Sequence, residues 1–240
     1  MLFRSGKGCK DWDSENLVKM IRSLQPGIIL NNRLDLPGVG DIITPEQYTP
    51  DAPLRDENGN PAVWEGCQTF SGSWGYHRDE MTWKSAKQCI DLLINHVCCN
   101  GNLLMNVGPN ARGQFDARAM QRLDDFGRWM SANSRSIYGC GPAPEEFPVP
   151  RDCRYTWNPE TRRLYLHIMN WPFKHIHLYK LAGKLKYAQF LHDGSEVLLR
   201  ESASEIHEGL NSKSPAGAAT LDFPVVKPDV EVPVVELFLK

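Results

Sequence analysis

Segments with a helical pattern alternate with short apolar runs along the first half of the chain, and this alternation restricts the possible folds more than any other feature. The helical pattern covers residues 14–24, 85–97 and 116–132, and the apolar runs cover residues 27–33, 62–67 and 102–109. Continuous apolar runs are typical of strands buried on both faces, as in parallel sheets. Helices that alternate with such strands form βα units. The sequence therefore predicts an α/β fold with a parallel sheet for this half.

The second half carries strand patterns. Four prolines between residues 142 and 150 indicate a stiff linker, and residues 162–169 then alternate with period two. Further strand candidates follow at residues 184–191, 196–200, 219–223 and 234–239. Short strands at this spacing favour an antiparallel β-sandwich. We therefore expect two domains, residues 1–141 and residues 142–240.

Composition excludes several classes of protein. The 240 residues include 27 Lys and Arg against 29 Asp and Glu, so the formal charge of −2 gives no sign of a nucleic-acid partner. No apolar run approaches the roughly 20 residues that span a bilayer, so no membrane partner is expected. The first ten residues lack the apolar core of a secretory signal. These features together predict a cytoplasmic protein.

The seven cysteines are odd in number and sparse for the length of the chain. A disulfide scaffold is usually smaller, denser in cysteine and even in number, so we expect reduced thiols. Cys98 and Cys99 are adjacent at the end of a predicted helix, where neighbouring side chains point apart. We expect one buried and one exposed thiol there rather than a redox pair.

Polar residues follow the apolar runs where parallel α/β proteins place their functional groups. Arg33, Glu65 and Asn106 each lie at or near the predicted carboxyl end of a run. The long stretch 34–81 contains several aromatic residues, and a loop of that length inside a compact domain is usually functional. Aromatic faces stack on a pyranose and charged groups bind its hydroxyls, so the combination indicates a sugar site. Taken singly, Arg33 or Glu65 is also explained as a surface or capping residue.

Several short motifs occur in a fixed order along the chain. They are Lys10-Asp-Trp12, Leu24-Gln-Pro26 with Asn31-Asn-Arg33, Thr44-Pro-Glu-Gln47, Trp64-Glu65, Ser73-Trp-Gly-Tyr76 and Gly101-Asn-Leu-Leu-Met-Asn-Val-Gly-Pro109. As an ordered set they resemble the α-L-fucosidases of glycoside hydrolase family 29, and the resemblance covers essentially the whole chain. It implies a partial (β/α)8 barrel of the TIM type followed by the β-sandwich.

The resemblance also implies an activity and a set of site residues. The activity is retaining hydrolysis that releases terminal α-L-fucose from oligosaccharides, glycoconjugates or aryl fucosides, without a cofactor or a metal. Arg33 would hydrogen-bond the fucose and Trp74 would stack near its ring or methyl group. Trp64 and Tyr76, which lie in matching motifs, complete the expected substrate-binding set. The resemblance indicates a bacterial enzyme.

Two glutamates are candidates for the general acid/base that the resemblance implies. Some members of the family use a loop glutamate that matches Glu46, and others use a strand glutamate that matches Glu65. We favour Glu65, because a strand end holds a carboxylate more rigidly than a loop does. The structural alternative for Glu46 is a cap after Pro45, and the alternative for Glu65 is a partner of a nearby Arg.

The chain departs from the family pattern at its beginning. The family's nucleophile is an Asp upstream of the Lys10-Asp-Trp12 motif, but this sequence has no Asp before Asp11. Asp11 and Asp13 are better explained as helix caps. A barrel cut open exposes sheet edges, so we expect a homo-oligomer whose subunits cover the open sheet. The alternatives are a non-catalytic sugar-binding or structural remnant, and a half that works only with a separate front half.

Two features of the second half have a functional and a structural interpretation. His175 and His177 lie on one face of a predicted strand and have metal-ligand chemistry. No further ligand at suitable spacing accompanies them, so we expect structural or surface roles and no metal. Trp157 and Trp171 fit a carbohydrate-binding face, although core or edge packing is the favoured interpretation.

Overall fold

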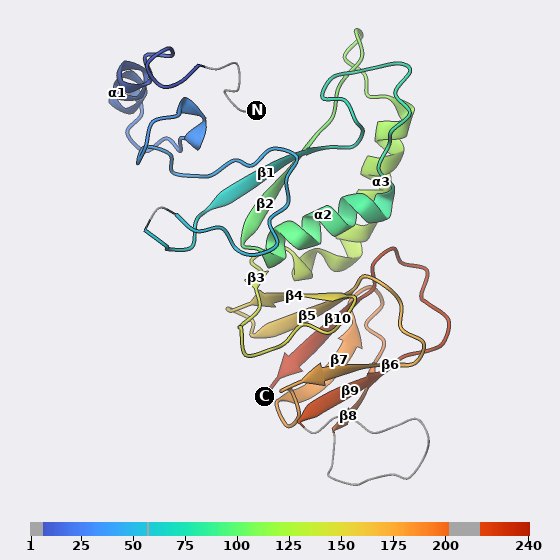
Figure 1. Cartoon of the computed structure of the whole chain (residues 1–240). Coiled ribbons are helices and arrows are strands. Elements are labelled where there is room, and N and C mark those ends of the chain that lie inside the picture. Colours follow the sequence, from blue (N-terminus) through green and yellow to red (C-terminus); the bar gives the residue numbers. More distant parts are fainter. Residues whose placement is uncertain (1–6, 57, 202–216) are drawn as a thin grey trace.

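The computed structural model describes residues 7–56, 58–201 and 217–240. A parallel α/β region comes first in the chain, and a region of two antiparallel sheets packs below it (Figure 1). This arrangement confirms the predicted change from α/β to all-β structure. No helix among the described residues is long and apolar enough to cross a membrane.

Four chain segments run parallel in the first region. The strands β1 (Trp64–Thr69) and β2 (Gly101–Asn106) pair residue for residue, from Trp64 opposite Gly101 to Thr69 opposite Asn106. The segment 42–47 lies along the other edge of β1, through parallel bridges at Ile43 and Glu46. The segment 30–32 lies beside it in turn, through a parallel bridge between Asn31 and Ile42. The order across the sheet is therefore 30–32, 42–47, β1 and β2.

The predicted strand over residues 27–33 is wrong for most of its length. It contributes a single bridge at Asn31, and the chain then turns into the 3₁₀ helix η1 (Asn32–Leu34). The Asn31 side chain accepts a hydrogen bond from the Arg33 N–H at 3.0 Å. Asn side chains that bind their own backbone two residues on favour a turn over a continued strand. This turn sets the direction in which Arg33 leaves the sheet.

Three helices accompany the parallel segments: α1 (Ser14–Leu24), α2 (Ala86–Cys98) and α3 (Ala117–Asn133). All three lie within one residue of the predicted ranges. A capping box starts α2, because Ser85 and Gln88 each bind the other's backbone N–H. Ile90 and Ile94 of α2 are fully buried.

Helix α1 differs from the other two because part of its apolar face is exposed. Met20 is 53% exposed and Leu24 is 79% exposed, and Ser14 is its one buried residue. Asp13 stands at the predicted N-cap but makes no capping bond, because its carboxylate accepts from the Asn16 side chain instead. Of the predicted apolar stripe, Met20 and Leu24 are therefore exposed, whereas Leu17 and Ile21 are partly buried.

The second region consists of two antiparallel sheets around one core. The larger sheet has the order β3 (Gly141–Pro142), β4 (Cys153–Asn158), β5 (Arg163–Ile168), β10 (Val234–Leu239) and β7 (Leu185–Phe190). The smaller sheet has the order β6 (His175–Tyr179), β9 (Ala218–Asp222) and β8 (Leu198–Glu201). Buried residues of both sheets, such as Leu166 and Leu221, form one apolar cluster. Trp157 and Trp171 pack against it, which agrees with the packing interpretation of both residues.

A second apolar cluster joins the two regions. Ile90 of α2 and Trp129 of α3 pack with Tyr165 and Val234 of the larger sheet. The Trp129 indole N–H donates to the Val232 carbonyl at 2.9 Å inside this cluster. The α/β region is therefore held to the β region by buried contacts rather than by a linker alone. The predicted boundary at 141/142 falls inside β3, and the division into two domains stays a prediction.

All seven cysteines are free, which agrees with the prediction of reduced thiols. Cys98 is half-buried and Cys99 is buried, so the expected exposed thiol is absent. Each thiol has its own partner, since Cys98 donates to the Tyr155 carbonyl and Cys99 to the Pro50 carbonyl. The two side chains thus point to different parts of the molecule, as expected for neighbouring residues at a helix end.

Candidate active site

A pocket of about 340 Å³ opens on the face of the parallel segments that points away from α2. Its lining consists of Asn31, Arg33, Thr44, Glu46, Glu65, Cys67, Trp74 and Leu104. Four of the six predicted site residues, Arg33, Glu46, Glu65 and Trp74, are therefore brought together. The structure combines an arginine, two carboxylates and an indole at one surface, which is the chemistry expected of a sugar site.

Arg33 and Glu46 form an ion pair at the carboxyl end of two neighbouring segments. The Arg33 Nη1 donates to Glu46 Oε2 at 3.0 Å, and each side chain is about a quarter exposed, at 26% and 24%. The same guanidinium donates to the Thr44 hydroxyl at 2.9 Å and to the Thr44 carbonyl at 3.3 Å. A planar guanidinium bound on several edges is fixed in orientation, and it fixes the carboxylate it contacts. The pair is a preorganised polar surface at the pocket wall.

Glu65 enters the pocket at a different level from Glu46. It is the second residue of β1 and lies opposite Asn102, whereas Glu46 pairs with Cys67 two residues further along β1. The prediction that Glu65 lies at a carboxyl strand end is therefore wrong. The strand continues through the polar residues Gln68 and Thr69, two residues beyond its predicted end at Cys67. Residues two apart on a strand share a face, so Glu65 and Cys67 both point into the pocket.

Cys67 is a lining residue that the sequence interpretation missed. Burial raises the pKa of its thiol, the Arg33 charge opposes that shift, and the Glu65 charge adds to it. A thiol with a raised pKa stays protonated at neutral pH and is a weak nucleophile. The spacing of two residues between Glu65 and Cys67 would have predicted that both side chains lie on the same face of the strand. Cys67 therefore contributes shape and polarity to the pocket rather than a reactive thiolate.

The loop that carries Trp74 is fixed from two sides. The Asn106 side chain, at the end of β2, donates to the Trp74 carbonyl at 2.5 Å. The Ser73 hydroxyl donates to the Glu80 carboxylate, also at 2.5 Å. Further donors from Thr82 bind the same carboxylate, and these hydrogen bonds lower the pKa of Glu80 to about 2. Asn106 at its predicted strand end thus positions the loop that carries the indole.

Trp64 and Tyr76 do not line this pocket. Trp64 is fully buried on the opposite face of β1, where its indole lies tilted against the ring of His96 of α2 and donates to the Cys99 carbonyl at 2.8 Å. Its side chain is a core residue, which leaves it no access to a substrate. Tyr76 is 44% exposed and borders a separate small hollow beside Glu80. The expected contact of Tyr76 with substrate has no support in the pocket geometry.

No group of three or more His, Cys, Asp or Glu side chains among the described residues is placed to hold a metal ion. His175 and His177 lie with their ring centroids 4.8 Å apart on β6. His177 shares a 2.9 Å hydrogen bond with the Thr220 hydroxyl of the neighbouring strand β9. This contact is consistent with the structural role expected for the pair.

Comparison with known proteins identifies relatives of one kind. A family model described as Alpha-L-fucosidase matches residues 4–135. The plasma alpha-L-fucosidase of Rattus norvegicus is 33% identical over 133 residues, which are 54% of this chain and 27% of the relative. The Alpha-L-fucosidase of Dictyostelium discoideum is 34% identical over 111 residues, 45% of this chain and 24% of the relative.

Solved structures extend the similarity to nearly the whole chain. Alpha-L-fucosidase isoenzyme 1 from Paenibacillus thiaminolyticus superposes with a TM-score of 0.85 at 36% identity, over 96% of this chain and 54% of that chain. An alpha-L-fucosidase GH29 from Bacteroides thetaiotaomicron shares the fold, with a TM-score of 0.76 at 23% identity over 95% of this chain and 52% of the relative. The chain spans about half the length of these structures and about a quarter of the curated relatives. The family match and the shared fold show that this chain belongs to the α-L-fucosidases of glycoside hydrolase family 29.

Proposed function

We propose that the pocket is part of an α-L-fucosidase active site, and that it serves the retaining hydrolysis of terminal α-L-fucosides. The observation that carries this proposal is the convergence of Arg33, Glu46, Glu65 and Trp74 on one pocket. The four parallel segments would be part of a (β/α)8 barrel, and fucose-containing oligosaccharides or glycoconjugates would be the substrates. A related GH29 enzyme from Bacteroides thetaiotaomicron was solved as a trapped covalent intermediate with 2-fluoro-fucosyl fluoride. A covalent intermediate is a step of the retaining mechanism.

Glu46 is our choice for the general acid/base. It lies at the carboxyl end of its segment, next to Arg33, where parallel α/β proteins concentrate catalytic groups. Glu65 lies nearer the amino end of β1, which removes the reason for favouring it. In this assignment Glu46 protonates the glycosidic oxygen and later deprotonates the water that releases the sugar. Arg33 would bind a sugar hydroxyl and Trp74 would stack on the apolar face of the ring.

The second candidate function is fucose binding without turnover. A retaining mechanism needs a nucleophilic carboxylate as well as an acid/base, and Glu46 and Glu65 are the carboxylates lining this pocket within the described residues. If Glu46 is the acid/base, the nucleophile would have to be Glu65, which lies nearer the amino end of β1, or a carboxylate from outside the described pocket lining. A pocket that binds fucose through Arg33 and Trp74 alone is a lectin-like site.

Hydrolysis of 4-nitrophenyl α-L-fucoside by the purified chain tests the proposal. Glu46→Gln should lower kcat by about 10²- to 10⁴-fold, the usual contribution of general acid/base catalysis. Glu65→Gln should have a smaller effect, and Glu160→Gln, an exposed glutamate of the β region, should have none. NMR of the first product formed should show the α-anomer of fucose.

Each other outcome has a defined meaning. Equal rates for the wild-type chain and Glu46→Gln would overturn the acid/base assignment. If the wild-type chain shows no turnover, calorimetric titration with fucose separates the remaining possibilities. Binding that is weakened by Arg33→Ala supports the lectin-like function, and absence of binding overturns both functions.

A further inference from the structure

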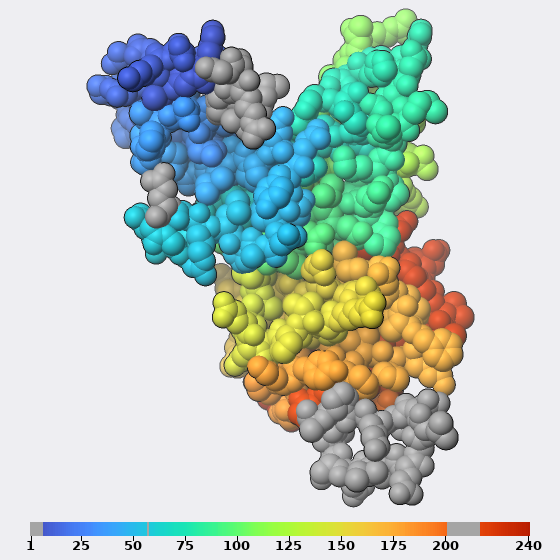
Figure 2. All heavy atoms as spheres, viewed as in Figure 1, coloured from blue at the N-terminus to red at the C-terminus, as the bar shows by residue number. Residues whose placement is uncertain are grey.

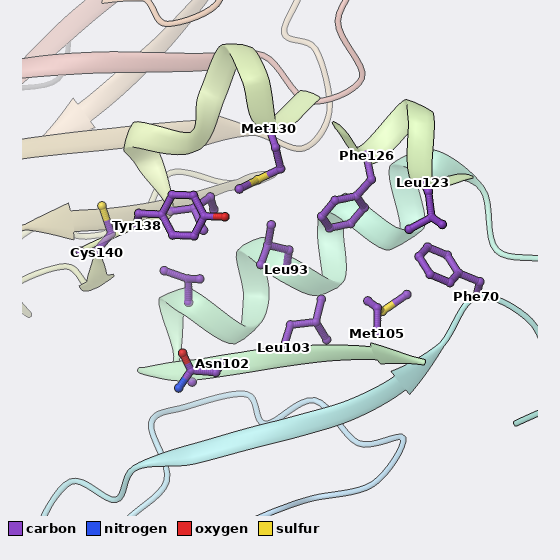
Figure 3. Close-up of a pocket in the computed structure, with 14 residues that line it drawn as sticks. Phe70, Leu93, Asn102, Leu103, Met105, Leu123, Phe126, Met130, Tyr138 and Cys140 are labelled. Atoms are coloured by element: carbon purple, nitrogen blue, oxygen red, sulfur yellow. The ribbon is translucent and has the colours of Figure 1, made fainter. Parts of the chain in front are cut away.

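The Trp74 loop (residues 70–84) connects β1 to α2 and closes on itself at its base. There the Lys84 N–H donates to the Phe70 carbonyl at 2.9 Å. Phe70 is buried, and Figure 3 shows it close to Met105 of β2. The loop therefore leaves the sheet from a fixed base.

Strand β2 presents a polar side chain to the start of this loop. Figure 3 shows Leu103 and Met105 pointing from β2 toward α2 and α3. Leu104 lines the candidate pocket on the other face of the strand, and Asn106, two residues further on, shares that face. Asn106 pairs with Thr69, the last residue of β1. The Asn106 side chain thus lies where the chain leaves β1 for the Trp74 loop.

Asn106 holds the backbone of the residue that carries the indole. Its side-chain amide donates to the Trp74 carbonyl at 2.5 Å. A hydrogen bond to this carbonyl restrains the peptide group that joins Trp74 to Gly75. The indole, which lines the pocket, therefore projects from a backbone position that β2 sets.

Gly108 lies directly against the next part of the loop. A Cβ atom on Gly108 would lie 2.4 Å from the Gly75 carbonyl carbon and 2.5 Å from the Tyr76 nitrogen. Gly108 does not adopt the left-handed backbone conformation that favours glycine, so lack of space explains this glycine. Pro109 follows at once and restricts Gly108 to extended backbone. In Figure 2 the teal surface of the Trp74 loop adjoins the light-green surface of the segment after β2.

The far side of the Trp74 loop is fastened to helix α3. Arg118 donates to the Glu80 carbonyl at 2.6 Å and to the Arg78 carbonyl at 3.2 Å. Asp116, the N-cap of α3, accepts from the same guanidinium at 2.8 Å through each of its two carboxylate oxygens. A guanidinium bound on several edges is fixed in orientation. The loop is therefore held from both β2 and α3, as a rigid support would be.

We propose that Gly108 and Asn106 are positioning residues that fix the Trp74 indole at the pocket before a sugar binds. The proposal rests on the proposed function in one respect, the stacking of this indole on fucose. A side chain that is already ordered loses little freedom on binding, and this favours affinity. Gly108 and Asn106 act through the backbone of residues 74–76 rather than by touching the sugar.

Fluorine NMR of the chain labelled with 5-fluorotryptophan tests the positioning without a sugar. The chain has seven tryptophans, and Trp74→Phe identifies the Trp74 line. Gly108→Ala and Asn106→Ala should each shift or broaden that line. Both should leave the Trp64 line unchanged, because Trp64 is buried on the opposite face of β1. Circular dichroism melts confirm folding, and Asn106→Ala, which only removes atoms, keeps the test decisive if Gly108→Ala does not fold.

Two substitutions of the same kinds are the matched controls. Gly127→Ala adds a Cβ in α3 that would meet no atom within 4 Å. Asn102→Ala removes an amide of β2 that donates to the Trp64 carbonyl at 3.4 Å rather than to the loop. Neither change should move the Trp74 line.

Calorimetric titration with L-fucose measures the consequence for binding. Gly108→Ala and Asn106→Ala should each weaken the affinity about 3- to 10-fold, the scale of ordering one side chain on binding. Gly127→Ala and Asn102→Ala should bind fucose as the wild-type chain does.

The two measurements separate this proposal from the proposed function. An unchanged Trp74 line in both variants would overturn the proposal, because the indole would keep its place without these contacts. A shifted line with unchanged fucose affinity would also overturn it, because the position of the indole would not affect the sugar. A wild-type chain that binds no fucose overturns the proposed function instead, and the fluorine spectra then decide the positioning alone.

Discussion

The Arg33 guanidinium donates to the Glu46 carboxylate at 3.0 Å, and the two residues are 13 positions apart in the chain. Thr44 holds the same guanidinium through its hydroxyl and its carbonyl, so the contact is part of a small network rather than an isolated surface ion pair. Exposed ion pairs contribute little to stability. The main effect of this network is therefore to fix the orientation of the Arg33 and Glu46 side chains at the pocket wall.

Replacing Arg33 with Lys tests whether that orientation matters. Lys keeps the charge but has no planar fork, so it cannot hold Thr44 and Glu46 in the same fixed geometry. We expect the affinity for fucose to fall by about 1–2 kcal/mol, the scale of one charge-assisted hydrogen bond. Calorimetric titration measures this change. Arg55→Lys, at an arginine that binds only the nearby Gly59 carbonyl among the contacts described, is the control and should leave the affinity unchanged.

Glu80 gives the Trp74 loop a dependence on pH. Hydrogen bonds from Ser73 and Thr82 lower the pKa of Glu80 to about 2, whereas an unfolded glutamate titrates near 4.3. The ionised carboxylate therefore stabilises the fold above about pH 4.3, and this stabilisation is lost as the pH falls toward 2. Glu80→Gln should lower the melting temperature at pH 7. It should also make the melting temperature less dependent on pH between about pH 4.3 and pH 2.

A neighbouring carboxylate provides the control for Glu80. Asp79 is 71% exposed at its side chain, and among the described residues its ion-pair partner is the adjacent, exposed Arg78. Asp79→Asn should therefore leave both the melting temperature and its pH profile close to those of the wild-type chain. If Glu80→Gln and Asp79→Asn behave alike, the Ser73 and Thr82 hydrogen bonds do not stabilise the loop.

The helices could be predicted from the sequence, but one parallel segment could not. Segment 42–47 is too short for a periodic pattern, and Pro45 lacks the N–H that a regular ladder uses. Its pairing with β1 nevertheless persists on either side of the proline, through Ile43 and Gln47. Backbone contacts of this kind depend on the neighbouring strand and leave no trace in side-chain periodicity.

The members of the candidate site could be predicted in part from the sequence, but their positions along the strands could not. Motifs placed Arg33, Glu46, Glu65 and Trp74 in one set, and the pocket contains all four. The same set included Trp64, although adjacent strand residues point to opposite faces and Glu65 takes the pocket face. Strand alternation therefore excluded Trp64 as a contact once Glu65 was chosen. How far along the sheet each residue lies depends on the pairing register of the strands, and this register could not be predicted from the sequence.

His167 should make the β region sensitive to acid. Burial lowers the pKa of this histidine to about 3, and its Nε2 shares a 2.9 Å hydrogen bond with the Thr156 hydroxyl. In the unfolded chain this histidine takes up a proton near pH 6.5, whereas in the folded chain it stays neutral until about pH 3. The free energy of unfolding therefore falls as the pH drops from about 6.5 toward 3. His167→Gln should reduce the slope of unfolding free energy against pH in this range, measured by denaturant titration. An unchanged slope would mean that His167 is protonated in the folded state.

Gly101 should be the least replaceable residue of β2. A Cβ atom on Gly101 would lie 2.1 Å from the Trp64 ring, and Trp64 is fully buried and cannot move aside. Overpacking of this kind costs about 1–3 kcal/mol, so Gly101→Ala should lower the free energy of unfolding by at least that amount. Gly127→Ala is the matched control, because a Cβ on this helical glycine of α3 would meet no atom within 4 Å. Removal of a glycine from a helix interior should raise stability by about 0.5–1 kcal/mol. Denaturant unfolding of both variants should therefore give changes of opposite sign, and a neutral Gly101→Ala would mean that the Trp64 ring has room to shift between β1 and α2.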